Sequence, residues 1–390
     1  MNKFSWASAL VILLVLSAST LSTAQTYSVL YSFGNVTGDG ISPSGTLARD
    51  SAGNLYGTTQ SGGTQGVGII FKLDSSNAET ILYNFSLAPD AISPPYGVVR
   101  SNSGALYGSA NGGRNGTQLG DGSIFKITAS GTESVLHSFG NGTDGLNPSG
   151  GLIQDSKGNS YGVTVSGGTH GWGTLFKITP AGKETILYNF TLAAANPEGA
   201  LLLDQHGNLY GTTASGGKYS FGTVYEYSAA GRFHVIYNFC QQAHCPDGSQ
   251  PIAGLVRDSA GNLYGTTLNG GANLQGTVFK VTPSGTESVL HSFGLAGGDG
   301  YLPIAGLVTD GSGNFYGTTL YGGANSAGTI FKIDSAGNES ILYSFCAQPS
   351  CADGNVTTFG TLIRDGSGNL YGVTEGGGFF QSGVIFKITP

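Results

Sequence analysis

The chain has 390 residues, of which 67 are glycine, only 10% are charged and one is methionine, and its formal net charge is −7. This composition suits short strands joined by tight turns and argues against amphipathic helices. The negative charge and the absence of a Lys/Arg run argue against nucleic acid and anionic membrane surfaces as partners, because both attract basic patches.

Residues 1–24 have the features of a secretory signal peptide. Lys3 supplies the positive charge, residues 7–16 form a mainly apolar core, and residues 22–24 are the small residues Ser, Thr and Ala. The apolar stretch is shorter than the ~20 residues that span a bilayer, and no second hydrophobic span follows. We therefore expect a mature chain of residues 25–390 that is secreted to the periplasm, the extracellular space or the cell surface.

One phrase recurs seven times along the chain, at intervals of 49 to 55 residues between its Tyr-Gly pairs. Each copy contains four short segments, A to D, that are rich in Val, Ile, Thr, Leu and aromatic residues and bounded by Gly, Pro, Ser or Asp; residues 254–293 show the unit in full. Such a unit predicts the four-stranded antiparallel blade of a β-propeller, with a layer of a β-solenoid as the alternative. The tyrosines of the pairs are Tyr56, Tyr107, Tyr161, Tyr210, Tyr264, Tyr316 and Tyr371.

The two ends of the repeat array favour the propeller. Residues 26–33 match strand D without a preceding A, B or C, and residues 383–390 match strand C without a following D. If the N-terminal strand completes the last blade, the ring closes and no sheet edge is left exposed. We therefore predict an all-β fold: a single domain, residues 25–390, forming a seven-bladed β-propeller closed by its own N-terminal strand.

Four cysteines form two pairs with identical spacing at the same point of two repeats. They are Cys240 and Cys245 in FCQQAHCPDG, and Cys346 and Cys351 in FCAQPSCADG. An oxidising compartment favours two disulfides, each closing its own small loop. Metal binding assisted by His244 is the alternative, but the second pair has no such histidine.

Several charged residues recur with the blade. A lysine on strand C accompanies a glutamate on strand D, as in Lys280 with Glu287, and we interpret these as cross-strand pairs worth ~0.2–1 kcal/mol each. Aspartates such as Asp258 begin the A–B turns, and we assign them to hairpin chemistry. His137 and His291 replace the usual tyrosine of strand D, and we interpret both as structural.

The phrase GNLYGTT…GG…GTVFK, with its strand D ending in LYSF, resembles the GloVer-type tandem repeat (choice-of-anchor tandem repeat family) of exported, often surface-associated bacterial proteins. The resemblance covers residues 26–390. It implies a β-propeller and brings no established catalytic residues. Locally, GLVRDSAGNLY also resembles the strand A–B phrase of NHL and SMP-30-type propellers, which include lyases and lactonases.

In a four-stranded blade the D–A and B–C loops lie on one face of the ring. These loops vary in length, whereas the A–B and C–D turns are nearly uniform, and variable loops on a rigid frame are where binding usually lies. Aromatic residues, and one histidine, occur in the B–C loops where other blades have Gly, Ala, Asn or Gln. They suit stacking on sugars or capture of a partner side chain, with packing on neighbouring loops as the alternative. The candidates are His170, Trp172, Tyr219, Phe221, Tyr321, Phe379 and Phe380.

The D–A loops also carry a recurring Asp-Gly pair, usually followed by proline. A ring of these carboxylates around the channel mouth could hold calcium, although Asp-Gly before proline is also ordinary turn chemistry. The weak metal candidates are Asp39, Asp144, Asp247, Asp299 and Asp353.

An enzyme would need the remaining outliers on this face to converge. These are His170 and His244, with Glu198 and Glu375, and the sequence contains no G-x-S-x-G or H-E-x-x-H motif. We assign no catalytic residue. The sequence predicts a secreted, monomeric, non-catalytic binding or surface-interaction module for extracellular carbohydrate or protein. The alternatives are a metal-assisted lyase or hydrolase at the channel mouth, and a structural envelope or matrix protein.

Overall fold

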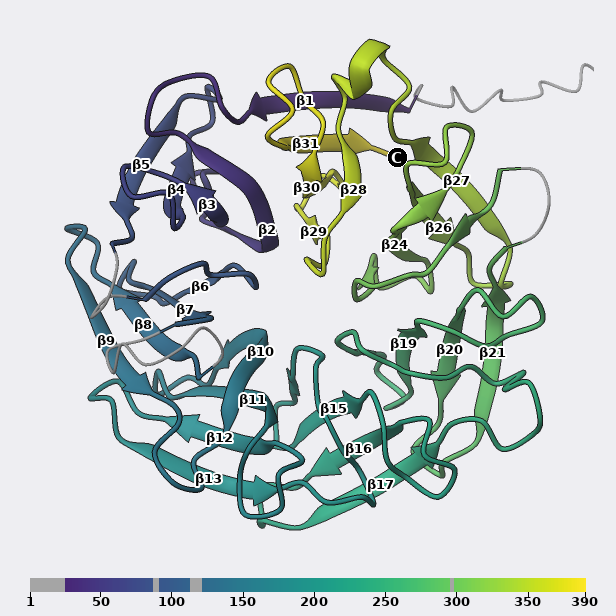
Figure 1. The fold of residues 1–390 in the computed structure, drawn as a ribbon. Coiled ribbons are helices and arrows are strands. Elements are labelled where there is room, and N and C mark those ends of the chain that lie inside the picture. Colours follow the sequence, from purple (N-terminus) through teal and green to yellow (C-terminus); the bar gives the residue numbers. More distant parts are fainter. Residues whose placement is uncertain (1–24, 87–90, 113–120, 295–297) are drawn as a thin grey trace, which may run out of the picture.

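The computed structural model describes residues 25–86, 91–112, 121–294 and 298–390. Within these residues the fold is all-β, and the one helical element is a short 3-10 turn at Pro349–Cys351. Seven sheets surround a central opening (Figure 1). The prediction of a seven-bladed β-propeller is confirmed, while the predicted signal peptide, residues 1–24, lies outside the described residues. No helix in the described part of the chain is long and apolar enough to cross a membrane.

Each blade lists its strands from the central opening outward. Blade one contains β2 (Gly40–Arg49), β3 (Leu55–Gly62), β4 (Ile69–Leu73) and β5 (Glu79–Asn84). Blade two contains β6 (Val98–Arg100), β7 (Leu106–Ala110), β8 (Ser123–Ile127) and β9 (Glu133–Ser138). Blade three contains β10 (Leu146–Gln154), β11 (Ser160–Ser166), β12 (Thr174–Ile178) and β13 (Glu184–Asn189). Blade four contains β14 (Leu202–Leu203), β15 (Leu209–Thr213), β16 (Thr223–Tyr227) and β17 (Phe233–Asn238).

The remaining blades follow the same order. Blade five contains β18 (Val256–Arg257), β19 (Leu263–Thr267), β20 (Thr277–Val281) and β21 (Glu287–Ser292). Blade six contains β23 (Val308–Thr309), β24 (Phe315–Thr319), β26 (Thr329–Ile333) and β27 (Glu339–Ser344), with the small pair β22 (Gly300–Tyr301) and β25 (Tyr321–Gly322) beside it. Blade seven contains β28 (Asn355–Thr357), β29 (Ile363–Arg364), β30 (Leu370–Gly376) and β31 (Val384–Thr389).

The N-terminal strand β1 (Thr26–Ser32) is the outer strand of blade seven. It pairs antiparallel with β31, from Thr26 opposite Thr389 to Ser32 opposite Val384. In Figure 1 the purple first strand lies directly beside the yellow last strand. The chain therefore closes its ring with its own two ends, as the sequence predicted.

Each residue of the repeated Tyr-Gly pair has a separate role. A Cβ atom on Gly265 would lie 2.8 Å from the ring of Phe279 on the next strand, so glycine leaves room for that ring. Phe279 in turn packs on Phe239 of the preceding blade, with ring centroids 5.0 Å apart. An equivalent ring pair joins every pair of adjacent blades, at 5.0 to 5.4 Å, and such pairs add about 0.5–1.5 kcal/mol beyond their buried area.

The tyrosine of the pair closes the A–B turn. In blade five, Asp258 accepts hydrogen bonds from the Asn262 backbone N–H (2.8 Å), the Asn262 side-chain amide (2.7 Å) and the Tyr264 hydroxyl (2.9 Å). Burial raises the pKa of Asp258, but these hydrogen bonds outweigh it and hold the pKa below its ordinary value. The same network occurs in blades one, three, four, six and seven. The assignment of these aspartates to hairpin chemistry agrees with this geometry.

The predicted Lys–Glu cross-strand pairs were wrong. The register places Lys280 opposite Ser288 and Glu287 opposite Val281, so the lysine and the glutamate point to opposite faces of the sheet. The Lys280 ammonium instead lies over the Tyr264 ring, 5.9 Å from its centroid. The glutamates belong to a different contact, described below.

Both cysteine pairs form disulfides, Cys240 with Cys245 and Cys346 with Cys351. Each bond closes a small loop between an outer strand and the next blade, which confirms the predicted pairing. Disulfides are typical of proteins that fold outside the reducing cytoplasm.

Candidate binding face and blade seams

The B–C loops brace the following blade through their backbones. The carbonyl oxygen of Trp172 accepts the N–H of Asn196 in the next D–A loop (3.1 Å), and that of Phe221 accepts the N–H of Gln250 (2.9 Å). Other blades make the same bond from a residue of another type, including Gln275. The fold therefore needs the backbone at this position and leaves the side chain free to vary.

The two aromatic side chains at this position are exposed. Trp172 has 36% and Phe221 has 44% of its surface accessible. Because blades three and four are adjacent, the two rings stand at equivalent points of neighbouring loops. Within the same loops His170 is exposed, and Tyr219 is partly buried beneath the Lys218 ammonium, 5.1 Å from its ring centroid.

The remaining aromatic candidates belong to blades six and seven. Phe379 is 78% and Phe380 is 41% exposed, with ring centroids 5.0 Å apart. Tyr321, 40% exposed, lies near Tyr301 at 5.6 Å. The predicted residues thus form two separate groups, and no bound ligand tests either of them.

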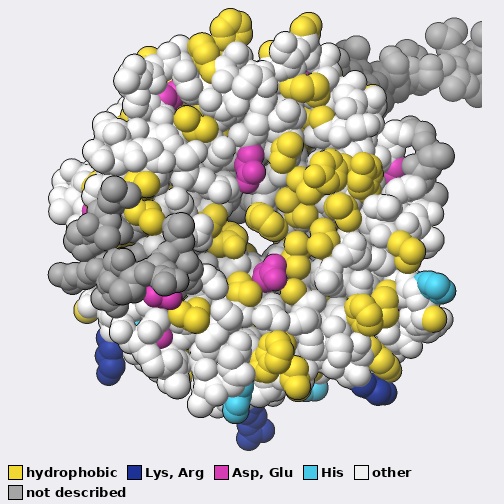
Figure 2. Space-filling view, viewed as in Figure 1, with side chains coloured by type: hydrophobic (Ala, Val, Ile, Leu, Met, Phe, Trp, Pro, Cys, Tyr) yellow, Lys and Arg dark blue, Asp and Glu magenta, His cyan; other side chains and the backbone are white. Residues whose placement is uncertain are grey.

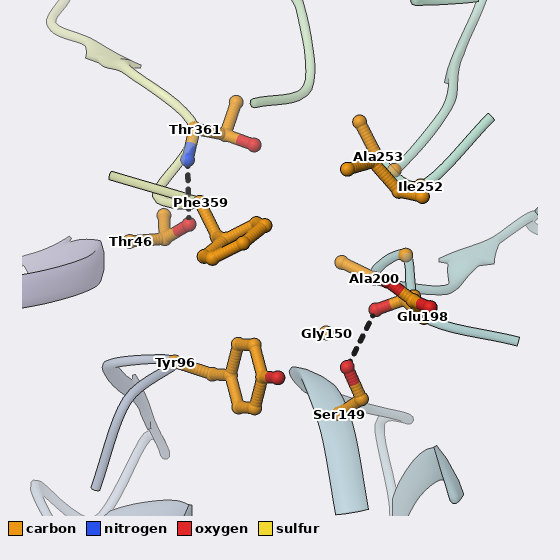
Figure 3. Close-up of a pocket in the computed structure, with 12 residues that line it drawn as sticks. Thr46, Tyr96, Ser149, Gly150, Glu198, Ala200, Ile252, Ala253, Phe359 and Thr361 are labelled. Carbon is orange, nitrogen blue, oxygen red and sulfur yellow. Dashed lines mark hydrogen bonds between the residues drawn. The ribbon is translucent and has the colours of Figure 1, made fainter. Parts of the chain in front are cut away.

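The central opening is narrow. A cavity of about 50 Å³, space for a few water molecules, lies where the inner strands meet. Figure 3 shows Tyr96, Glu198 and Phe359 around it, and the Ser149 hydroxyl donates to the Glu198 backbone carbonyl at 2.9 Å. Burial raises the pKa of Glu198. On the face shown in Figure 2, acidic and hydrophobic side chains flank the opening, and Lys and Arg lie at the periphery.

The acidic and histidine outliers do not converge there. Glu375 accepts a hydrogen bond from the Gln60 side chain (3.0 Å) and belongs to blade seven, whereas Glu198 belongs to blade four. Burial raises the pKa of Glu375 as well. The clusters of three metal-ligating side chains among the described residues include neither glutamate, and neither His170 nor His244.

Two larger hollows open on the side of the A–B turns. One, about 420 Å³, lies between Tyr264 and Phe315 beside Thr309, and the other, about 680 Å³, lies beside Gln154. Thr309 and Gln154 end strand A where other blades have an arginine, such as Arg100, whose guanidinium lies 5.4 Å from the centroid of the preceding blade's Tyr56 ring. The hollows therefore mark the places where this arginine is missing. Sequence reasoning favoured the opposite face and did not anticipate them.

The D–A loop aspartates lie at the rim of the ring instead of around its channel. The outer strands follow one another end to end along the circumference, as β13, β17 and β21 do in Figure 1. We call each junction between successive outer strands a seam and number it by its two blades. In seam 7/1, Asp39 accepts hydrogen bonds from the Tyr31 hydroxyl (3.0 Å) and the Gly34 N–H (2.8 Å). In seam 4/5, Tyr237 donates to Asp247 at 2.8 Å.

A glutamate from the start of the next outer strand completes these seams. Burial and the nearby charge of Asp39 raise the pKa of Glu79 to about 7, and burial and Asp247 do the same for Glu287. The strand D glutamate therefore faces the preceding blade and shares a seam with its tyrosine. This placement replaces the lysine partnership expected from the sequence.

Two seams have histidine in place of this tyrosine. In seam 2/3, His137 Nε2 lies 3.3 Å from an Asp144 carboxylate oxygen and 3.6 Å from one of Glu184. Burial lowers the pKa of His137, an effect that Asp144 opposes, and burial with Asp144 raises the pKa of Glu184 to about 7.

Seam 5/6 repeats the cluster. His291 Nε2 lies 3.6 Å from Asp299 and 3.7 Å from Glu339. Sequence analysis treated both histidines as structural and missed these clusters. The available signal was the phrase ESVLHSF, which occurs twice and is followed each time by a D–A loop aspartate and then by the next blade's glutamate.

The last two seams contain stacked rings where the others have glutamate. Tyr188 stacks on Phe233 in seam 3/4 (centroids 4.0 Å apart, planes 4° apart), and Tyr343 stacks on Tyr27 in seam 6/7 (3.8 Å, 5°). Tyr343 also donates to Asp353 at 2.6 Å. All five predicted D–A loop aspartates are thus seam residues.

The fold and its repeats together define a propeller built from one duplicated blade. The sequence matches the Gloeobacter/Verrucomicrobia repeat over residues 17–156, 114–313 and 231–390. The chain therefore belongs to this repeat family, which confirms the resemblance stated above. A search of functionally curated proteins finds no match.

Solved structures support the fold. The extracellular domain of a putative one-component system from B. thetaiotaomicron is similar, with a TM-score of 0.57 at 10% identity over 92% of this chain, which spans 39% of that chain's length. Two gluconolactonases are also similar: a putative one (TM-score 0.41, 14% identity, 82% of this chain and 92% of that chain) and one from Xanthomonas campestris (0.45, 11%, 93% and 89%). At such identities the likeness to the first establishes the propeller architecture alone.

Proposed function

We propose that the protein is a secreted, non-catalytic surface-recognition module that binds extracellular carbohydrate through its D–A/B–C loop face. The observation that carries the proposal is the pair Trp172 and Phe221. Their backbones make the inter-blade hydrogen bond that other blades make with smaller or polar residues, so the exposed rings are not needed for folding. Exposed aromatic rings on adjacent loops provide a stacking surface for sugar rings.

The surroundings of these rings favour an uncharged ligand. The B–C loops of blades three and four consist mainly of Gly, Ser and Thr, and only 10% of the whole chain is charged. Hydroxyl and backbone groups beside an aromatic ring suit the mixed polar and apolar faces of a sugar. A protein partner that inserts its own side chains is the other occupant that the experiment distinguishes.

The test uses the mature chain, residues 25–390, with its disulfides intact. Binding to a panel of bacterial and plant polysaccharides is measured by affinity electrophoresis and calorimetry for the native chain and for W172A/F221A. We expect the double variant to lose affinity at least about tenfold, because each ring stack contributes about 0.5–1.5 kcal/mol. Leu192→Ala removes a side chain that is 64% exposed in a D–A loop and serves as the matched control.

Equal binding by the native chain and W172A/F221A would contradict the proposal. Retention of a purified cell-surface protein, with no polysaccharide bound, would replace carbohydrate by protein as the ligand. Export is tested separately, because a secreted protein whose N-terminal sequence begins at Gln25 supports the predicted cleavage. Accumulation of the uncleaved chain in the cytoplasm would exclude the secreted role.

A further inference from the structure

The two histidine seams differ from the tyrosine seams by one side chain, and that difference leaves polar atoms unsatisfied. In seam 7/1 the Tyr31 hydroxyl reaches Asp39 and hydrogen-bonds to it. In seam 2/3 the shorter imidazole does not: His137 Nε2, an Asp144 oxygen and a Glu184 oxygen are buried and make no hydrogen bond. In seam 5/6 the same holds for His291 Nε2 and a Glu339 oxygen. Each buried polar atom without a partner costs about 1–3 kcal/mol.

The spacing of these atoms matches a metal coordination sphere. Zinc bonds to nitrogen and oxygen of about 2.0–2.1 Å place two ligand atoms of a tetrahedron about 3.3 Å apart. The distances from His137 Nε2 to its two carboxylates are 3.3 and 3.6 Å, and those from His291 Nε2 are 3.6 and 3.7 Å. Within each cluster one atom from each of the three residues lies within 4.8 Å of the others. A contraction of a few tenths of an ångström gives three bonds to one ion.

We propose that His137, Asp144 and Glu184 form one divalent transition-metal site, and that His291, Asp299 and Glu339 form a second. One imidazole and two carboxylates suit zinc and its first-row neighbours, whereas calcium prefers oxygen ligands alone. Each cluster offers three protein ligands and lies at the rim, with 6% to 18% of the side chains exposed, so a water molecule can complete the coordination.

The surrounding structure holds the ligands in place. The Phe139 ring packs edge-on against His137 (4.7 Å), and Phe293 does the same for His291 (4.8 Å). The other oxygen of Asp144 accepts the Gly140 N–H at 3.1 Å, which leaves one oxygen directed at the histidine. Packing and second hydrogen bonds of this kind orient metal ligands.

A bound ion would join three segments from two blades. In seam 2/3 it would connect the end of β9, the D–A loop and the start of β13, and it would offset the repulsion between two close carboxylates. Seams 2/3 and 5/6 are three blades apart, so the sites act independently. Since an ion that binds only the folded state stabilises it by mass action, we expect metal-dependent resistance to unfolding.

The experiment titrates ZnCl₂ into the tag-free mature chain after chelator treatment, using calorimetry. We expect two equivalents for the native chain, one for H137Y or H291Y, and none at comparable affinity for the double variant. Loss of a direct ligand should weaken binding at least about 100-fold, since second-shell changes alone cost 10- to 100-fold. Tyrosine occupies this position in the other five seams, so these variants keep the fold, which circular dichroism checks.

A gain-of-site variant provides a second readout. Tyr237→His places an imidazole beside Asp247 and Glu287, and we expect the zinc stoichiometry to rise to three. Cobalt supplies a spectroscopic check, because a site with imidazole and carboxylate ligands gives visible absorption that H137Y/H291Y should lose. The proposal is overturned if the native chain binds zinc no tighter than millimolar, or if H137Y/H291Y binds as much zinc as the native chain.

Discussion

Glutamate seams and aromatic seams solve the same packing problem with opposite chemistry. Five outer strands begin with a glutamate that faces the preceding blade, and two begin with an aromatic residue, Phe233 or Tyr27, that stacks on the preceding tyrosine. A stack at 3.8 to 4.0 Å needs no proton and no counter-ion. A glutamate next to an aspartate needs one of them, because two close carboxylates repel each other.

The position of the aromatic seams is informative. One of them, seam 6/7, is formed by β1 and therefore closes the ring. Tyr27 stacks on Tyr343, contacts Phe386 with ring centroids 5.6 Å apart, and donates its hydroxyl to the Asp353 carbonyl at 2.6 Å. The strand with the fewest covalent constraints thus has a contact that does not depend on protonation. The glutamate seams lie between blades that the chain already connects.

The largest expected effect comes from removing the closing strand. Deletion of residues 26–33 removes β1 and the buried Phe33, and it exposes β31 as an open sheet edge. We expect loss of the cooperative thermal transition and aggregation, because exposed edges pair with other chains. Calorimetry and size-exclusion chromatography measure both. A truncated protein that melts like the mature chain would show that the ring does not need this closure.

The second prediction concerns pH. The folded-state pKa of Glu79 and Glu287 is raised from 4.5 to about 7, so folding favours their protonated forms. Their contribution is fully present below the unfolded pKa and is lost as pH rises through about 7. We expect the melting temperature to fall between about pH 5 and about pH 8. Aspartates of the A–B turns have lowered pKa values and act only at lower pH.

Neutral variants sharpen this comparison. E79Q/E287Q keeps the size of both side chains and removes their titration, so its melting temperature should vary less over the same range. At about pH 8 we expect it to melt about 2–4 °C higher than the native chain, the shift for roughly 1 kcal/mol. Glu226→Gln is the control, since Glu226 lies on strand C, outside the seams. A parallel pH dependence in native and double-variant proteins would place the titration elsewhere.

The fold could be predicted because its signals are local and repeated. Strand composition, the Tyr-Gly period and the turn aspartates each recur in most blades, and two disulfides follow from five-residue separations. The seams could not be predicted this way. His137 and Glu184 are far apart in sequence and meet only because outer strands lie end to end, a property of blade twist that one blade's sequence does not show.

The lysine error has the same origin. Residue types on adjacent strands suggested a pair, but the register separates them by one position, and a shift of one residue moves a side chain to the other face of the sheet. The exposed loop aromatics could be identified from the sequence because they interrupt a repeated pattern. Their exposure, and the separation into two groups, required the structure.

The smallest expected effect tests that corrected register. Glu287 faces the seam and Lys280 faces Tyr264, so a double-mutant cycle of Lys280→Met and Glu287→Gln should give a coupling energy near zero. Lys280→Met alone should cost about 0.5–1 kcal/mol, the value of a cation–π contact at a surface. Urea unfolding at about pH 6 measures both. A coupling near 1 kcal/mol would restore the ion pair, and with it the view that the strand D glutamates stabilise individual blades instead of the joints between them.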